Sequence, residues 1–153
     1  MPKKWIDDRN EIDSILKRCE VGSLATVNPD CTPYVVTVNY VYSSGKIYFH
    51  GALKGKKMDN IGYRSGVCFE VHEVDRIVRS ERAIDFGTRY HSVIINGNAR
   101  EITDPEAKRK ALIILTEKYA DGQPFEPPSD GEVNATAVVE IEILKITGKK
   151  NTD

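Results

Sequence analysis

The chain has 153 residues, the size of one domain, so we expect a single domain over residues 1–153. Apolar residues make up 40% and charged residues 29%, and the net charge of -1 argues against a basic surface for nucleic acid or an anionic membrane. No apolar run approaches the roughly 20 residues of a membrane span, and no signal-peptide stretch follows the basic N-terminus. We therefore expect a cytoplasmic protein with no membrane or nucleic-acid partner.

Residues 5–20 have the spacing of an amphipathic helix, because Ile12, Ile15, Leu16 and Cys19 recur at i, i+3, i+4 and i+7. Six strand candidates follow, rich in β-branched and aromatic residues or alternating between apolar and polar ones. They are Val21–Val27, Pro33–Tyr42, Lys46–His50, Val67–Val74, His91–Arg100 and Ala137–Ile146.

Two further helices are predicted, over Lys56–Tyr63 and over Pro105–Tyr119, where Asp104 is a suitable N-cap. Two segments are predicted as surface loops, Asp75–Arg89 and the proline-rich Asp121–Gly131. Tight turns between consecutive strands imply antiparallel pairing, and six short strands indicate a small closed barrel. The predicted fold class is mainly β (α+β), with helices flanking the barrel.

The cysteines and histidines do not predict a metal site or a disulfide framework. The three cysteines, an odd number at wide spacings without a C-x-x-C pair, are Cys19, Cys31 and Cys68. The three histidines, none at a metal-binding interval from another, are His50, His72 and His91. Cys68 and His72 would lie about 13 Å apart along one strand, which is too far to share a metal ion directly.

The segment Gly51–Lys57 superficially resembles a nucleotide-binding P-loop. It has three residues between its glycines where the P-loop has four, and Lys57 stands where a serine or threonine would bind magnesium. ATP or GTP hydrolysis is therefore excluded. The chain also contains no G-x-S-x-G elbow and no cysteine in a recognisable protease context.

The segment from His50 to Lys57 nevertheless has the features of a phosphate site. A strand ends at Ala52, and Gly55 and Lys56 open the predicted helix. A helix N-terminus offers free backbone N–H groups and a partial positive charge, glycine permits close approach, and lysines supply cations. On the motif alone, a solvated basic turn after a hairpin is the alternative interpretation.

Five blocks of the chain, taken together and in order, carry a resemblance. They are GSLAT (22–26), PYVVTVNY (33–40), IYFHGA (47–52) with GKK (55–57), VCFEV (67–71) and YHSVIINGNAR (90–100). In this order they resemble the flavin-binding split-barrel superfamily related to pyridoxamine 5′-phosphate oxidase. The resemblance is greatest to its 5-nitroimidazole-resistance-like branch.

The resemblance implies a six-stranded antiparallel split β-barrel that forms a homodimer and binds FMN at the subunit interface. The residues implied to line the flavin ring are Val36, Thr37, Val38 and Asn39. Those implied beside the ring and the ribityl chain are His50, Gly51 and Ala52. The phosphate would be held by Gly55, Lys56 and Lys57, and a further polar contact would come from Ser92.

Two features depart from the oxidase itself. Lys56 stands where the oxidase usually has an arginine, and lysine binds phosphate as a point charge rather than as a fork. No C-terminal block resembles the substrate-binding tail of the oxidase, so oxidation of pyridoxamine phosphate is not expected. In the nitroimidazole-resistance branch, a histidine at the position of His50 is implicated in substrate chemistry. The alternative is a histidine at the strand end that only shapes the pocket.

The resemblance predicts an FMN-dependent oxidoreductase that acts on a nitroaromatic compound or another small electrophile. Two other functions stay open. The barrel could hold a flavin, a deazaflavin or haem without turnover, with one of the three histidines as the axial ligand of haem. It could also be a cofactor-free, dimeric partner protein.

Overall fold

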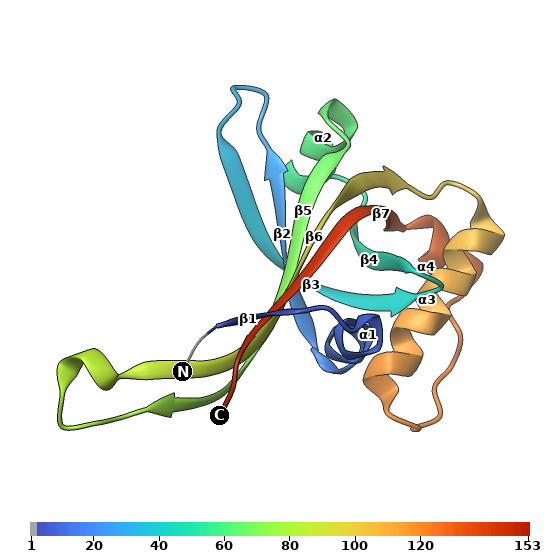
Figure 1. Ribbon diagram of the computed structural model, residues 1–153. Helices are drawn as coiled ribbons and strands as arrows, with labels where there is room; N and C mark the ends of the chain where they lie inside the picture. The colour runs from blue at the N-terminus through green and yellow to red at the C-terminus, as the bar shows by residue number, and fades with distance from the viewer. Residues whose placement is uncertain (1–2) are drawn as a thin grey trace.

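The computed structural model describes residues 3–153 (Figure 1). Its elements, in chain order, are β1 (Lys4–Ile6), α1 (Arg9–Arg18), β2 (Val21–Val27), β3 (Pro33–Ser43), β4 (Lys46–Ala52), α2 (Lys56–Tyr63), β5 (Gly66–Val78), the 3₁₀ helix η1 (Ala83–Asp85), β6 (Gly87–Glu101), α3 (Pro105–Ala120), α4 (Asp130–Asn134) and β7 (Thr136–Asn151). None of the helices within residues 3–153 is both long and apolar enough to cross a membrane.

Six strands close into a barrel in which all neighbours are antiparallel. The order is β7-β4-β3-β2-β5-β6, and β6 pairs with β7 to complete the ring. A seventh strand, β1, pairs with the far end of β7, from Lys4↔Lys150 to Ile6↔Gly148. The predicted fold class and antiparallel barrel are confirmed, while the predicted number of six strands omits β1.

The predicted helix over residues 5–20 begins later than expected. The side chain of Asp8 accepts a hydrogen bond from the N–H of Asn10, so α1 starts at Arg9 and the preceding residues join the sheet as β1. The predicted apolar face is buried as expected at Ile12, Ile15 and Leu16. A three-residue strand has too short a pattern to be recognised, and pairing with β7 decides its conformation.

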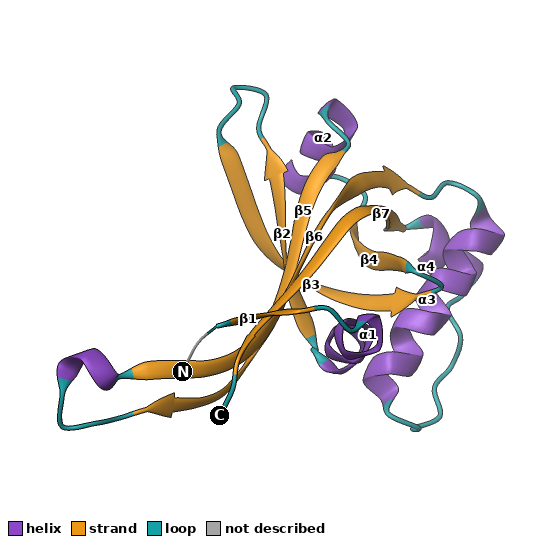
Figure 2. Ribbon diagram, viewed as in Figure 1, coloured by secondary structure: helices purple, strands orange, loops and turns teal. Residues whose placement is uncertain are grey.

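The predicted loop Asp75–Arg89 is instead a two-stranded arm. Strands β5 and β6 stay paired out to Val78↔Gly87, with η1 at the tip, and the arm projects from the barrel (Figure 2). The predicted loop Asp121–Gly131 also contains the start of a helix. There the side chain of Ser129 accepts a hydrogen bond from the N–H of Glu132 and caps α4.

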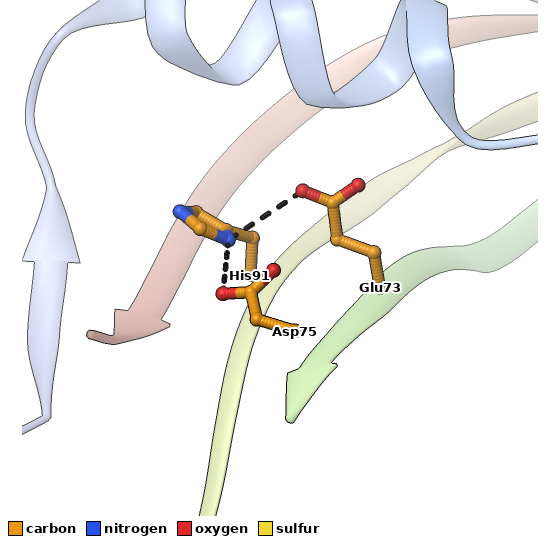
Figure 3. A group of neighbouring side chains, drawn as sticks. All are labelled: Glu73, Asp75 and His91. Atoms are coloured by element: carbon orange, nitrogen blue, oxygen red, sulfur yellow. Dashed lines mark ion pairs between the residues drawn. The ribbon is translucent and has the colours of Figure 1, made fainter. Parts of the chain in front are cut away.

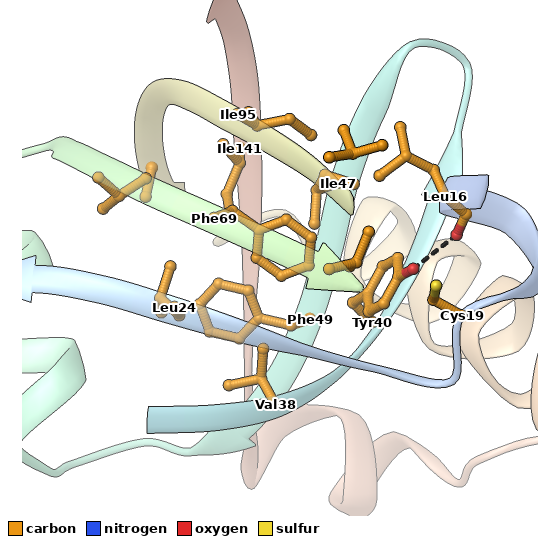
Figure 4. Close-up of a cluster of buried hydrophobic side chains, with 14 of the residues drawn as sticks. Leu16, Cys19, Leu24, Val38, Tyr40, Ile47, Phe49, Phe69, Ile95 and Ile141 are labelled. Carbon is orange, nitrogen blue, oxygen red and sulfur yellow. Dashed lines mark hydrogen bonds between the residues drawn. The ribbon is translucent and has the colours of Figure 1, made fainter. Parts of the chain in front are cut away.

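The barrel interior is filled by aromatic and aliphatic side chains from all six barrel strands and α1 (Figure 4). Tyr40 is fully buried beside α1, and its ring meets Phe69 edge-to-face with the ring centroids 4.9 Å apart. Its hydroxyl donates to the carbonyl oxygen of Leu16 at 2.6 Å. Tyr40 therefore ties β3 both to β5, two strands away around the barrel, and to the end of α1.

Helix α3 is fastened to β3 beside this core by two side chains. The ammonium of Lys118 donates to the carbonyl oxygens of Cys19 and Tyr40 at 2.7 and 3.0 Å, and lies 3.6 Å from the centre of the Tyr40 ring. The backbone N–H of Tyr40 donates to the hydroxyl of Tyr119 at 2.9 Å. Burial lowers the pKa of Lys118 to about 8.

A glycine in β6 provides a test of the close packing of the barrel wall. A Cβ at Gly97 would overlap the carbonyl oxygen of Glu142 and lie 2.9 Å from Cγ2 of Ile141. We expect Gly97→Ala to lower the free energy of unfolding, measured in urea, by about 1–3 kcal/mol because the site is overpacked. Gly66→Ala in β5, where a Cβ meets nothing within 4 Å, is the control and should cost less than about 0.5 kcal/mol. Equal stabilities of the two variants would contradict this packing.

Candidate functional site

Strand β3 changes its partner part-way along its length. Residues 33–39 pair with β2, whereas β4 pairs with β3 only from Tyr40↔Phe49 to Ser43↔Lys46. Strand β4 continues to Ala52 on β7. Among residues 3–153, no strand pairs with the second edge of β3 over residues 33–39. The barrel is therefore split between β3 and β4, and backbone polar groups along this edge are available to a ligand.

A pocket of about 140 Å³ lies at one end of this split. Its lining comes from β3, from the end of β4 and from the first turn of α2. The residues are Tyr34, Val36, Ala52, Lys54, Gly55, Lys56, Lys57 and Met58. Three lysines and no carboxylate are in this set, so the pocket is suited to an anion.

Helix α2 is held at the pocket by a buried amide. Asn60 is 1% exposed, and its side-chain N–H groups donate to Oγ1 of Thr26 and to Oδ1 of Asn28 at 3.0 and 2.9 Å. Ile61 is buried in the barrel core beside it. These contacts orient α2 so that its N-terminus, with its partial positive charge, faces the pocket.

Two glycines shape the cationic end of the pocket. Gly55 is the N-cap of α2 with a φ of 154°, which favours glycine, and no side chain caps the helix. The first N–H groups of α2 thus remain available to a bound anion. At Gly51, a Cβ would come within 3.0 Å of Nζ of Lys57, so the glycine lets this lysine lie across β4.

Three lining residues were not among the residues named for the predicted site, although Lys54 lies within the predicted segment from His50 to Lys57. The ring of Tyr34 lies 4.6 Å below the ammonium of Lys56, as a cation–π contact that holds the lysine at the pocket. Lys54 and Met58 also line it. Tyr34 has a signal in the pattern, since it is two residues before Val36 and shares its face of β3.

The flavin-ring residues predicted in β3 divide between two faces. Val36 lines the pocket, but Val38 is 5% exposed and part of the barrel core. Thr37 and Asn39 alternate with them and are exposed on the outer face. Ser92 lies on β6, three strands away around the sheet, and does not line the pocket. One chain thus brings together only part of the predicted set.

His50 lies on β4 beside the pocket, opposite Val138 of β7. It alternates with the buried Phe49 and its side chain is exposed. Partial loss of hydration lowers the pKa of His50 below its ordinary value, and the ammonium of Lys57 lowers it further. The lowered pKa favours the neutral imidazole, in which one nitrogen is a donor and the other an acceptor.

Larger hollows occur elsewhere on the surface, but they do not combine several lysines with the N-terminus of a helix. One of about 480 Å³ is lined only by residues of α3, and it is consequently an open helix surface. Another of about 660 Å³ runs along the arm, and its lining includes η1 at the tip, the start of β6 and Asn151 of β7.

The proximity of Lys57 to His50 can be measured by NMR titration. We expect the pKa of the His50 imidazole to lie below its ordinary value, and Lys57→Met to raise it because a neighbouring positive charge is removed. Lys54→Met is the matched control, because Lys54 lines the same pocket but does not shift the pKa of His50. A pKa that responds to neither substitution would contradict the placement of Lys57.

The comparisons with known proteins agree with this architecture. A family model described as pyridoxamine 5′-phosphate oxidase matches residues 8–150. A search among curated proteins gave no match. A candidate 5-nitroimidazole antibiotic resistance protein from Bacteroides thetaiotaomicron is 25% identical, with a TM-score of 0.86 over 97% of this chain and 87% of that one.

Two more solved structures share the fold. A FAD and haem binding protein from Mycobacterium smegmatis is 19% identical, with a TM-score of 0.90 over 98% of this chain and 74% of that one. A flavocytochrome from Azotobacter vinelandii is 21% identical, with a TM-score of 0.85 over 99% and 70%. Because the family model extends over nearly the whole chain, this protein belongs to the pyridoxamine 5′-phosphate oxidase family.

Proposed function

We propose that this protein binds FMN in the split between β3 and β4 and reduces a small electrophile, such as a nitroaromatic compound. The observation that carries the proposal is the pocket at the N-terminus of α2, where three lysines meet an uncapped helix end. This set of donors fits a phosphate group, which carries close to two negative charges at neutral pH. Two of the similar structures are named for flavin or haem groups, and a third for nitroimidazole resistance.

The residues at the split would share the work of holding the cofactor. Lys56, Lys57 and the N–H of Gly55 would hold the phosphate, and the chain at Gly51 and Ala52 would pass beside the ribityl group. The flavin ring would lie along the unpaired edge of β3. Val38 would contribute through its backbone alone, because its side chain is in the core.

Bound flavin supplies hydride or electron transfer to the reaction. The role of the protein would be to orient the flavin ring, to exclude water from its inner side and to place a proton donor beside the ring. His50 fits the last role, since its neutral imidazole can donate from one nitrogen and accept at the other. The alternative role of His50, shaping the pocket only, predicts no effect on the chemical step.

A second copy of the chain is part of the proposal. The outer sheet face over β3, β2, β5 and β6 is exposed or half-buried and nearly uncharged, although 29% of the chain is charged. The register assigns to this face Val21, Ser23, Ala25, Val35, Thr37, Asn39, Cys68, Glu70, His72, Ser92, Ile94 and Asn96. Such a face is suited to a homodimer. Thr37, Asn39 and Ser92 would then reach flavin at the interface between the copies.

The test is turnover by the purified protein. We expect the purified protein to show the absorption bands of oxidised FMN, either as isolated or after FMN is added. The mass of the cofactor released from the protein should be that of FMN. NADH or NADPH should bleach these bands without oxygen, and a 5-nitroimidazole should restore them. His50→Gln should slow this reoxidation by roughly a hundredfold, the size of a general acid–base contribution, while FMN stays bound.

Lys110→Gln provides the control, because Lys110 is exposed on α3 and does not line the pocket. Its reoxidation rate should equal that of the unsubstituted protein. A sharp Soret band would instead show haem, and a colourless protein that takes up no FMN would overturn the proposal. Bound FMN that is never reduced or reoxidised would mean storage without turnover.

A further inference from the structure

Three metal-ligating side chains converge where the arm leaves the barrel, away from the split (Figure 3). Glu73 and Asp75 are in β5, and His91 lies directly opposite Glu73 on β6. A bulge between Val74 and Arg76 leaves Asp75 out of the ladder. Both carboxylates point toward the His91 ring from the same side of the strand pair.

The separations within the cluster match those of ligands around one ion. Nδ1 of His91 is 3.2 Å from Oδ2 of Asp75 and 3.5 Å from Oε1 of Glu73. One ligand atom from each of the three residues lies within 4.8 Å of the others. Metal–ligand bonds of about 2.1 Å in a tetrahedral site place neighbouring ligand atoms about 3.4 Å apart. The two distances from Nδ1 of His91 are close to this value, so one ion could contact all three residues once the carboxylates adjust around it.

The His91 nitrogen that faces the two carboxylates has an unsatisfied hydrogen-bonding capacity within the described part of the chain. Nδ1 of His91 is buried and makes no hydrogen bond with any of residues 3–153, although two carboxylate oxygens lie within ion-pair distance. A buried nitrogen without a hydrogen bond destabilises the folded state. A metal ion would bind this nitrogen and would also offset the repulsion between the two carboxylates.

Arg18 of α1 occupies the other side of Glu73. Its Nε donates to both carboxylate oxygens at 2.9 and 3.0 Å, which lowers the pKa of Glu73. This contact fixes the orientation of the carboxylate, as outer hydrogen-bond partners of metal ligands do. One guanidinium against two carboxylates still leaves a net negative charge facing His91.

We propose that Glu73, Asp75 and His91 bind a divalent transition-metal ion, for which Zn²⁺ is the best match. Imidazole nitrogen together with carboxylate oxygen suits zinc, whereas calcium and magnesium prefer oxygen ligands alone. The ion joins β5 to β6 at the base of the arm and so stiffens the point from which the arm projects. This differs from the sequence-based prediction, which contained no metal site.

The test is calorimetric titration of the full chain, without an affinity tag and freed of metal by a chelator, with Zn²⁺ as the probe. We expect saturation at one ion per chain. His91→Gln and Asp75→Asn should each weaken binding more than about tenfold, because even outer-shell partners contribute about 10–100-fold. Co²⁺ in place of Zn²⁺ should give a visible spectrum that His91→Gln abolishes.

His72→Gln is the matched control, because His72 also contacts a glutamate, at 2.8 Å, but lacks a third ligand. It should keep full zinc affinity. Circular dichroism shows whether each variant is folded, and if His91→Gln does not fold, the exposed Asp75→Asn decides. Absence of saturable binding, binding that survives both substitutions, or equal loss in His72→Gln would overturn the proposal.

Discussion

The exchange of partners by β3 at Tyr40 is the constraint on which the rest of the structure depends. Before Tyr40 the strand β3 pairs with β2, and from Tyr40 onward it pairs with β4. Tyr40 is fixed at this point by its hydroxyl bond to Leu16 and by Phe69. Where the β2–β3 ladder ends, the side chains of Lys118 and Tyr119 join Tyr40 to the residues before β2.

The candidate site follows from this exchange. Because β3 and β4 diverge beyond Tyr40, an edge of β3 is left unpaired and a pocket opens that α2 closes at one end. Asn60 anchors the helix, and Gly51 and Gly55 let lysine side chains and backbone N–H groups approach the same point. The split and the anion pocket are therefore consequences of one change in strand pairing.

Local pattern was sufficient for much of the fold and for the cationic end of the site. The bounds of β2 and α2 agree with their prediction, since capping, turn residues and apolar spacing are local signals. Gly55, Lys56 and Lys57 line one pocket, because three consecutive residues at a helix start cannot separate, while their predicted role in holding a phosphate stays a prediction. The short strand β1 and the paired arm needed partners distant in sequence, and local pattern did not predict them.

Features that depend on register could not be predicted in the same way. The side chain of Val38 lies in the barrel core, because its neighbours in the sheet decide which face of β3 points inward. The resemblance instead assigned the whole run from Val36 to Asn39 to the flavin, without regard to the face of each side chain. Glu73 and His91 are 18 positions apart and become neighbours only through the β5–β6 register. The contact between Tyr34 and Lys56 likewise joins a strand to a helix across the split. Each requires the tertiary structure.

The central claim is that the pocket at α2 recognises a flavin phosphate. The most direct measurement compares the affinities of FMN and riboflavin, which differ only in that phosphate, for the unsubstituted protein and for the double variant Lys56→Ala/Lys57→Ala. Two charge-assisted contacts, each worth about 1.5–3 kcal/mol, predict that the unsubstituted protein binds FMN at least about tenfold more tightly than riboflavin. The double variant should lose most of this preference for FMN. Equal affinity of the unsubstituted protein for FMN and riboflavin would contradict the account.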